Sequence, residues 1–516
     1  MSEKNCGIIE AMCWYASRKP ARMHMPGHKG KGVFSGGLVS MPADPNPEWA
    51  RRLLDELRVI DMTESPGLDN LHYPSGCIRE VERRAEKLFG SARSYILVNG
   101  ATSGVQASLL AARMVLGARS VLVPRNAHRS MMTAMAMSGL EPVFVWPEHN
   151  PNLGGYLPLD VERIKEAFER EVARGGRPPK AVVVINPTYC GFARNLSEIA
   201  EITHASGAIL IVDEAHGTHF KVGRELPPSA LDCGADLVVH GAHKTTVAFT
   251  QTAFLHVGPS APERFPGLIP AVEESLRAVQ TTSPSYILMA SLQQAIEVLE
   301  RDGGQWVNRG VERACELSRR LARIPRLSVV GYDPSNPVPP GLMHDPGRIL
   351  VNLAELGVTG PQAARFLVEE KGVDPEMVGL QHILMICTGA DSEEDIDTVE
   401  AAFRDLAERC PREHSSQFDV SLLLGEAPRP ARVMSLREAF LSMAEAVDLD
   451  QAAGRISADT VVVYPPGAPL ITPGEEFDSA TVEYITNARK AGLNVLGRGV
   501  HSGLAETKVF CVRSSN

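Results

Sequence analysis

Short apolar runs that alternate with helical patterns constrain the fold of this chain more than any other feature of its sequence. Between the first two runs, the stretch 103–116 carries its apolar residues at helical spacing. Continuous apolar strands separated by helices are typical of a parallel sheet that is covered on both faces. The sequence therefore predicts an α/β domain with a mostly parallel sheet, whose strands are 95–98, 120–123, 142–146, 181–185, 209–212 and 237–239.

A second α/β pattern follows the first. A long helix over 285–301 leads out of the sheet domain, and a proline-rich loop occupies 333–341. After this loop the periodicity predicts a strand, a helix, a strand and an acidic helix, over 348–353, 360–371, 382–386 and 391–410.

The sequence also suggests where the units of the chain begin and end. Residues 7–18 predict a short amphipathic helix, and the basic, glycine-bearing stretch 22–32 has a composition that predicts no regular structure. That stretch is either a disordered arm or a loop ordered by a partner or ligand. A polar linker is expected at 411–417. We expect four units: an N-terminal helix and interface segment, a large cofactor-binding domain, a small α/β domain and a C-terminal domain, over 1–75, 76–310, 311–410 and 411–516.

Composition narrows the class of protein. The chain has 516 residues, of which 44% are apolar and 22% are charged, as in globular proteins. Its net charge of −10 argues against nucleic acid as a partner. The nine cysteines are scattered without a Cys-x-x-Cys pair, and no apolar run approaches membrane-spanning length. We therefore expect a cytoplasmic globular protein with reduced thiols that does not act on a membrane.

Two residues at neighbouring strand ends carry the predicted chemistry. Lys244 follows the apolar run 236–239, and Asp213 ends the run 208–213. A lysine in a loop at a strand end can condense with an aldehyde, and a nearby aspartate can keep a heterocyclic nitrogen protonated. A lone lysine after a strand is usually a solvated surface residue. Together with Asp213, however, Lys244 indicates a site for pyridoxal 5'-phosphate.

The turn after the first strand of the sheet supplies the expected phosphate contacts. Residues 99–104 read Asn-Gly-Ala-Thr-Ser-Gly and precede a helix. Small residues at a helix N-terminus direct backbone N–H groups and partial positive charge toward one point, where Ala101, Thr102 and Ser103 would meet a phosphate. Alone, this pattern is more often an ordinary turn in which Ser103 caps the helix.

Histidines are concentrated around these residues. His128 follows the second strand, and it is either a capping residue or an imidazole that stacks on the cofactor ring and moves a proton. Ala215 would pack under the other ring face. The density of histidines near Asp213 also raises the alternative of a zinc or iron site, with ligands from Asp213, His216, His219, His240 and His243. Their spacing fits no compact ligand motif, so we predict no metal.

Several runs carry a family resemblance in the right order. Around the two central residues these are DEAHGTH (213–219), AHKT (242–245) and TQTAFLH (250–256). Further runs are RMHMPGHKG (22–30), DMTE (61–64), GLDNLH (67–72), TSPSY (282–286), YPPGAP (464–469) and PGE (473–475). Together they resemble the bacterial ornithine/lysine/arginine decarboxylase family of fold-type-I pyridoxal-phosphate enzymes, in its shorter branch without an N-terminal receiver-like wing.

The resemblance implies a role for each site residue. Lys244 would carry the cofactor, Asp213 would meet the pyridine nitrogen, and His128 would stack on the ring. Thr102 and Ser103 would contact the phosphate, and His216 and His243 would lie close to the cofactor. Lys244, His128 and His243 are the candidate catalytic residues. The chain departs from the family at Gly241, where a phosphate-binding serine is common; we expect His243, a backbone N–H, or Thr282 or Ser283 of a neighbouring subunit to compensate.

The resemblance also implies the reaction. Short-branch members suggest decarboxylation of L-arginine to agmatine in polyamine synthesis, with L-lysine or ornithine as the alternative substrate. An aminotransferase and a non-catalytic regulatory homologue are the remaining alternatives. A cationic substrate needs an acidic partner for its distal group, and Glu475, Glu64 and Asp69 are the candidates. Active sites in this family form between subunits, so a homodimer or a larger homo-oligomer is expected.

Overall fold

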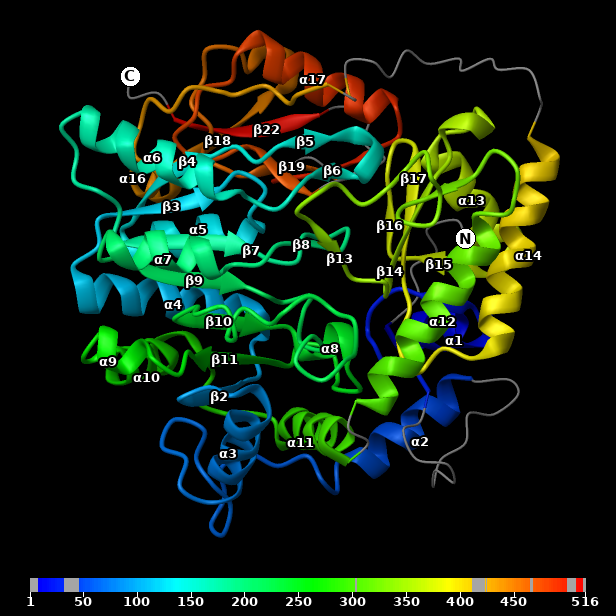
Figure 1. Cartoon of the computed structure of the whole chain (residues 1–516), viewed down its shortest axis with the longest axis horizontal. Helices are drawn as coiled ribbons and strands as arrows, with labels where there is room; N and C mark the ends of the chain where they lie inside the picture. Colours follow the sequence, from blue (N-terminus) through cyan, green and yellow to red (C-terminus); the bar gives the residue numbers. More distant parts are fainter. Residues whose placement is uncertain are drawn as a thin grey trace.

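A seven-stranded sheet organises the fold, with strands in the order β2, β11, β10, β9, β7, β3 and β4 (Figure 1). The computed structural model describes residues 8–31, 46–301, 304–410, 423, 425–464, 467–498 and 507–513. β11 runs antiparallel to both of its neighbours, and the other adjacent pairs are parallel. The strands are β2 (Arg93–Leu97), β3 (Ser120–Pro124), β4 (Glu141–Val145), β7 (Ala181–Ile185), β9 (Ile209–Asp213), β10 (Leu237–His240) and β11 (Ala253–Val257).

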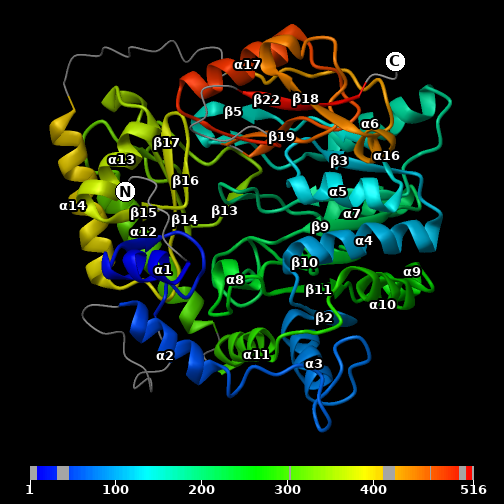
Figure 2. The same cartoon turned by 180° about the vertical axis from the view of Figure 1, so that it is seen from behind.

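Helices cover both faces of this sheet, as continuous apolar strands require. Adjacent strand residues point to opposite faces: Ile96 and Phe254 lie in one core, whereas Leu97 and Leu255 lie in the other. The first face, seen in Figure 1, packs against α3 (Cys77–Phe89), α6 (Val161–Ala173), α7 (Ser197–Ala205) and α11 (Tyr286–Arg301). The second face, seen in Figure 2, packs against α4 (Gly100–Leu116), α5 (Arg129–Ser138), α9 (Ala261–Arg264) and α10 (Leu268–Val279).

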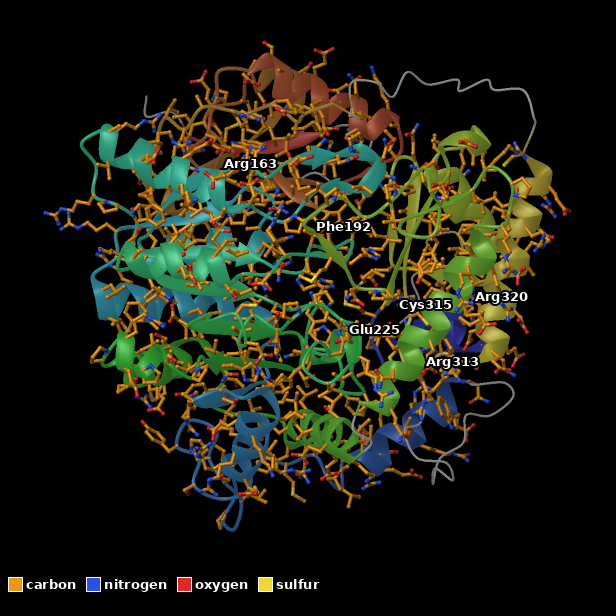
Figure 3. All side chains as sticks on the ribbon, in the orientation of Figure 1. Arg163, Phe192, Glu225, Arg313, Cys315 and Arg320 are labelled. Atoms are coloured by element: carbon orange, nitrogen blue, oxygen red, sulfur yellow. The ribbon has the colours of Figure 1, made fainter. Side chains whose placement is uncertain are left out.

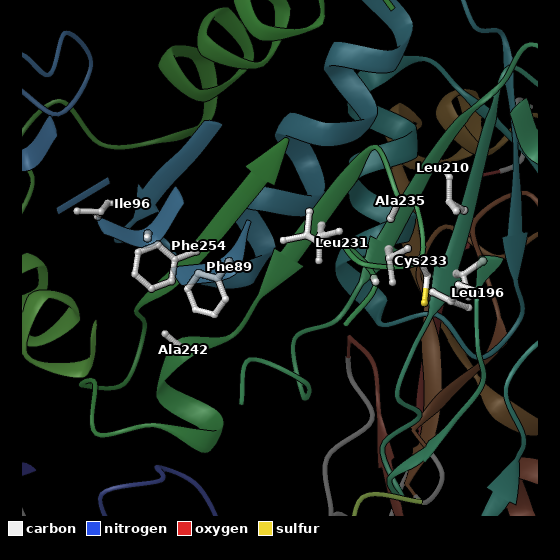
Figure 4. Close-up of a cluster of buried hydrophobic side chains, with 14 of the residues drawn as sticks. Phe89, Ile96, Leu196, Leu210, Leu231, Cys233, Ala235, Ala242 and Phe254 are labelled. Carbon is white, nitrogen blue, oxygen red and sulfur yellow. The ribbon is translucent and has the colours of Figure 1, made fainter. Parts of the chain in front are cut away.

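The lysine loop is anchored in the first of these cores. β10 leads directly into the one-turn helix α8 (Ala242–Thr245), and Ala242 is fully buried there. Phe89 and Phe254 belong to the same buried cluster, which Figure 4 shows beside Ala242. Because Ala242 is fixed in the core, Lys244, two residues later, is held at the end of the sheet.

The small domain is built on a four-stranded antiparallel sheet in the order β12, β14, β17 and β16. Arg320, on its outer surface, pairs with Asp397 at 2.7 Å and with Glu400 at 3.3 Å, and so links two helices (Figure 3). The strands are β12 (Ser328–Val329), β14 (Arg348–Asn352), β16 (Met377–Val378) and β17 (His382–Ile386), and the helices are α12 (Gln305–Leu321), α13 (Gly360–Lys371) and α14 (Glu393–Arg409).

The N-terminal arm is partly regular, which corrects the expectation of an irregular stretch at 22–32. β1 (Ala21–Met23) pairs in parallel with β15 (Val373–Pro375) of the small domain. The Lys29 ammonium is buried and donates to the carbonyls of His24 and Ile386, each at 2.8 Å. The N–H of Gly27 donates to the carbonyl of His243 at 2.9 Å. The chain itself therefore orders this arm and packs it against the lysine loop.

A C-terminal unit lies beside the β3–β4 end of the large sheet (Figure 1). Its own core includes Phe477, Ile471 and Ile485, which are fully buried. The linker expected at 411–417 lies outside the described residues. The elements of this unit are α16 (Leu436–Leu441), α17 (Ser479–Lys490), β18 (Ala444–Asp448), β19 (Val461–Tyr464), β20 (Ala468–Ile471), β21 (Asn494–Leu496) and β22 (Lys508–Val512).

Shorter elements complete the chain. β8 pairs with β13 between the large sheet and the small domain, and Figure 3 marks this junction at Phe192. Within the described ranges, no helix is long and apolar enough to cross a bilayer. These elements are α1 (Ile8–Ser17), α2 (Pro47–Leu57), β5 (His149–Asn150), β6 (Gly155–Tyr156), β8 (Phe192–Ala193) and β13 (Met343–His344).

The core beneath the lysine loop yields a first prediction. Phe254→Ala removes a fully buried ring, so the free energy of unfolding should fall by about 3–5 kcal/mol. Phe249→Ala is the matched control, because that ring is 45% exposed and its loss should change stability by about 0.5 kcal/mol or less. Denaturant unfolding followed by tryptophan fluorescence measures both. Equal losses in the two variants would contradict this account of the core.

Candidate active site

A cavity of about 360 Å³ lies at the carboxyl ends of the parallel strands, where open α/β sheets bind their ligands. The last residues of β7 and β9, and the segments that follow β2, β3 and β10, contribute to its wall. Eight of the predicted site residues line it: Ala101, Thr102, His128, Asp213, Ala215, His216, His243 and Lys244.

Lys244 lies at the centre of this group. Its Nζ is 2.8 Å from His216 Nε2. Burial lowers the pKa of the Lys244 amine to about 8, the charge of Asp213 opposes this shift, and the positive charge of Arg348 adds to it. An amine with this pKa is about one-tenth uncharged and nucleophilic at pH 7, far more than a solvated lysine.

Asp213 ends β9 and faces the same cavity. Its Oδ1 accepts the backbone N–H of Ala215 at 3.2 Å, which fixes the carboxylate at the strand end. The register of the sheet places Asp213 opposite Val239 of β10, five residues before Lys244. The two residues therefore meet because β9 and β10 are adjacent and parallel, as the sequence predicted.

His128 caps a helix and also lines the cavity, so the capping interpretation is confirmed and stacking on a cofactor ring stays a prediction. It is the N-cap of α5, where Nδ1 accepts the N–H of Ser130 at 3.3 Å and lies 2.8 Å from its hydroxyl. Burial lowers its pKa, and the charge of Asp213 opposes that shift. The imidazole is therefore neutral at pH 7, with Nδ1 engaged by the helix start.

The N-terminus of α4 forms the wall nearest β2. Gly100 adopts a left-handed φ of +74° and donates to the carbonyl of Gln251 at 2.8 Å. Ala101 and Thr102 follow in the first helical turn, where backbone N–H groups have no partner within the helix. Ser103 is buried, and its hydroxyl donates to the carbonyl of Gly100 at 2.8 Å. Ser103 therefore does not line the cavity, and the N-cap residue is Asn99 rather than Ser103.

Thr282 and Ser283 are exposed and lie outside this cavity. The loop that carries them is tied to α4 by the N–H of Thr281, which donates to Asn99 Oδ1 at 3.1 Å. Within one chain, the two hydroxyls are thus not brought to the predicted phosphate position.

The remaining histidines have different surroundings: His243 lines the cavity, whereas His240 and His219 contact carboxylates outside it. His243 Nδ1 lies 2.9 Å from the carbonyl of Thr252 and must donate to it, so a neutral ring presents an unprotonated Nε2. Burial lowers the pKa of His243. His240 turns into the core toward Glu214 at 2.7 Å, and His219 pairs with Asp345 at 3.2 Å. Among the described residues, no group of three or more His, Cys, Asp or Glu side chains is arranged to hold a metal ion.

Glu475, a predicted substrate contact, lies away from the cavity. It forms a two-pronged ion pair with Arg125 at 2.6 and 2.8 Å, and both side chains are buried. Its Oε2 also accepts the N–H of Thr472 at 2.8 Å. The pair joins the end of β3 to the C-terminal unit, so the carboxylate serves an internal contact in this chain.

Asp69 and Glu64 are likewise engaged locally. Asp69 accepts backbone N–H groups of Gly76 and Ile78 at the start of α3, at 2.8 and 3.0 Å. Glu64 accepts the N–H of Leu71 at 3.0 Å and lies outside the cavity wall. The structure therefore does not bring any of the three predicted acidic contacts to the cavity of one chain.

Three residues near the cavity were not predicted from the sequence. Arg348 Nη2 lies 2.8 Å from His216 Nδ1, and the Tyr189 ring lies 4.7 Å from the His216 ring. Glu376 accepts hydrogen bonds from the Tyr189 hydroxyl and, at 2.9 Å, from the N–H of Met25. Tyr189 and Met25 line the cavity, so Glu376 places negative charge behind its wall. Arg348 and Glu376 lie more than a hundred residues after Lys244, and no local pattern joins them to it.

Comparison with known proteins identifies the family of the chain. Residues 7–337 match the family described as Orn/Lys/Arg decarboxylase, major domain, and residues 426–497 match its C-terminal domain. The chain is 32% identical over 506 residues to an arginine decarboxylase of Bacillus anthracis, covering 96% of each chain. It is 25% identical over 583 residues to a lysine decarboxylase of Pseudomonas aeruginosa, covering 93% of this chain and 76% of that one.

The solved structures define the class of fold. Lysine decarboxylase A from Pseudomonas aeruginosa superposes with a TM-score of 0.76 at 22% identity, covering 95% of this chain and 81% of that chain. The predicted fold-type-I α/β architecture is therefore confirmed. With the family match over most of its length, the chain belongs to the Orn/Lys/Arg decarboxylase family of amino-acid decarboxylases.

The Arg125–Glu475 pair yields a second prediction. Glu475→Ala leaves a buried guanidinium without its counter-charge, so the free energy of unfolding should fall by about 3–5 kcal/mol. The surface variant Glu483→Ala should change it by about 0.5 kcal/mol or less. Thermal and denaturant unfolding measure the difference. Unchanged stability with a raised KM in Glu475→Ala would instead identify Glu475 as a substrate contact.

Proposed function

We propose that the cavity binds pyridoxal 5'-phosphate and that the protein decarboxylates a basic amino acid. The observation that carries the proposal is the convergence of an amine with a lowered pKa, a carboxylate and a helix N-terminus on one cavity. The volume of about 360 Å³ falls within the range of small-molecule sites. The donor set suits a ligand with an aldehyde, a basic ring nitrogen and a phosphate.

Several of the lining residues are suited to one part of this cofactor. Lys244 would hold it through its amine, and Asp213 would keep the ring nitrogen protonated. The first turn of α4, with Ala101 and Thr102, would receive the phosphate. When bound, pyridoxal phosphate supplies an electron-accepting ring for the charge released at the substrate's α-carbon.

The chain's own groups then control protons and solvent. His128 and Ala215 would face the two sides of the ring, where the small Ala215 side chain leaves room for it. His243 presents an unprotonated Nε2, and Lys244 carries an amine with a pKa of about 8. These are the groups available to accept or return a proton near the α-carbon at neutral pH.

Arginine is the substrate that we propose. The relatives at 32% identity that cover nearly the whole chain are named arginine decarboxylases, whereas those named lysine decarboxylases are 25% identical. Glu376 supports a cationic substrate, because it places negative charge against the cavity wall at Tyr189 and Met25. Agmatine and carbon dioxide are then the products, and agmatine leads to polyamines.

We also propose a homodimer or larger homo-oligomer in the cytoplasm. Apolar side chains are exposed in the N-terminal segment, including Ile8, Met12, Val59 and Ile60, and a second copy would cover them. The cysteines of the described residues are free thiols, most of them buried, which agrees with a reducing compartment. Residues of a neighbouring copy, such as Thr282 and Ser283, would complete the cavity.

The function is tested with a substrate panel. Arginine, lysine and ornithine are supplied to the protein loaded with pyridoxal phosphate, and carbon dioxide and amine are measured. We expect the highest kcat/KM for arginine. Lys244→Ala should lower kcat by about a thousand-fold or more, whereas the surface variant Lys165→Ala should retain it.

Each alternative has its own result in this panel. A higher kcat/KM for lysine or ornithine would overturn the choice of arginine. A keto-acid product would indicate an aminotransferase, and absence of both cofactor absorbance and turnover would indicate a non-catalytic homologue. Full turnover by Lys244→Ala would contradict the proposal as a whole.

Gly241 yields a further prediction about the cofactor site. A Cβ added there would lie 2.7 Å from the Ala215 carbonyl oxygen and 3.1 Å from Lys244 Cδ, so a serine does not fit without a shift of backbone. Gly241→Ser and Gly241→Ala should each lower stability by about 1–3 kcal/mol. Neither should bind pyridoxal phosphate more tightly, as measured by absorbance titration. If the serine variant alone bound pyridoxal phosphate more tightly, at unchanged stability, a serine hydroxyl at position 241 would improve phosphate binding and this prediction would be wrong.

A further inference from the structure

Arg348 is a buried cation whose hydrogen bonding is concentrated on one partner. It begins β14 of the small domain and is 1% exposed. Its Nη2 lies 2.8 Å from His216 Nδ1, whereas Nε and Nη1 have no hydrogen-bond partner among the described residues. Asp345 supplies the nearest negative charge, with Oδ2 at 3.7 Å from Nε.

The fold makes room for this side chain. Gly191 has a φ of +90°, and a Cβ at that position would lie 2.6 Å from both Cβ and Cγ of Arg348. Asp345 is itself held by His219 at 3.2 Å and by the N–H of Gly347 at 2.9 Å. The guanidinium is thus fixed in position against His216.

The hydrogen-bond chain has only one consistent direction. A guanidinium donates and never accepts, so His216 Nδ1 must be the acceptor of the Arg348 bond. Burial holds the pKa of His216 well below its usual value, so the ring is neutral and carries its proton on Nε2. That N–H points at Lys244 Nζ, 2.8 Å away. Lys244 accepts this bond in its uncharged form, because only an uncharged amine has a lone pair to do so, and the chain of hydrogen bonds therefore favours that form.

We propose that Arg348 is a positioning residue that acts through His216 to favour the uncharged form of the Lys244 amine. This Arg348–His216–Lys244 chain of hydrogen bonds, called the relay below, is formed by the protein alone and needs no cofactor. Its consequence, that the amine is ready to attack an aldehyde, rests on the proposed function. In the reverse tautomer His216 would accept from an ammonium at Lys244, but its Nδ1–H would then face the donors of Arg348.

The other charged and titratable groups around Lys244 act in both directions on its pKa. Asp213 at the end of β9 and Glu376 beyond β15 favour the charged amine. Arg348 and burial oppose it, and burial is the largest influence. His128 and His243, two further imidazoles on the cavity wall, both have lowered pKa values, and burial raises the pKa values of the wall groups Tyr156, Tyr189, Cys190 and Tyr464. Burial and the Arg348–His216 pair therefore favour the uncharged amine, and two carboxylates oppose them.

The test measures the protonation of Lys244 without cofactor or substrate. Cofactor-free protein is acetylated with a trace of acetic anhydride across pH, and labelling of Lys244 is measured by peptide mass spectrometry against Lys165. The midpoint should lie near 8 in the unaltered chain. Arg348→Met should raise it by about one pH unit or more, whereas Arg348→Lys, which still donates and cannot accept, should keep it within about half a unit.

A double-mutant cycle separates the relay from the direct charge of Arg348. In a His216→Phe background, Arg348→Met should shift the midpoint by clearly less than in the unaltered chain, because only the direct charge of Arg348 is then removed. A shift of equal size in that background would assign the effect to charge alone and overturn the proposal. An unchanged midpoint in Arg348→Met would also overturn it.

Folding of the variants is checked by circular dichroism. If Arg348→Met does not fold, Arg348→Gln takes its place, because its amide oxygen can accept from His216 Nδ1–H and should raise the midpoint in the same way. If no substrate of the panel is decarboxylated but the midpoints shift as expected, the proposed function is rejected and the role of Arg348 is still supported.

Discussion

Burial of the Lys244 amine is the constraint on which the site depends. An ammonium removed from water loses much of its hydration, so its charged form persists only where neighbours compensate. Asp213 compensates in part, and the His216–Arg348 pair does the opposite. The balance gives a pKa of about 8, which a solvated lysine at a strand end would not have. The reactivity of this residue is thus a property of its surroundings rather than of its loop.

Three parts of the chain supply those surroundings. The large sheet presents Asp213 and Lys244 because β9 and β10 are adjacent and parallel. The small domain contributes Arg348 from the start of β14, and the N-terminal arm closes over the lysine loop through Gly27 and Met25. β1 pairs with β15, so the arm is attached to the small domain by backbone hydrogen bonds. The site is therefore a product of contacts between units and not of the sheet domain alone.

Much of this could be predicted from local sequence. Apolar runs identified six strands of the large sheet, and the position of Lys244 and Asp213 at strand ends brought them together. β11 was not predicted as a strand, because an antiparallel strand inserted between β2 and β10 leaves no mark in the alternation of strand and helix. Arg348 and Glu376 were missed because a charged residue beside a short strand has the same local pattern whether it is solvated or buried. The ion pair of Glu475 with Arg125 could not be predicted for the same reason.

The histidines show most clearly what sequence leaves open. His216 and His240 are both buried beside the same loop, yet His240 donates toward Glu214 in the core while His216 faces Lys244. The difference lies in the group that each ring contacts: the Glu214 carboxylate accepts a hydrogen bond from His240, whereas the Arg348 guanidinium donates one to His216. Identical side chains thus take opposite roles according to the donor or acceptor set across from them. Because that set comes from residues distant in sequence, the tautomer of His216, and with it the charge on Lys244, follows only from the packed fold.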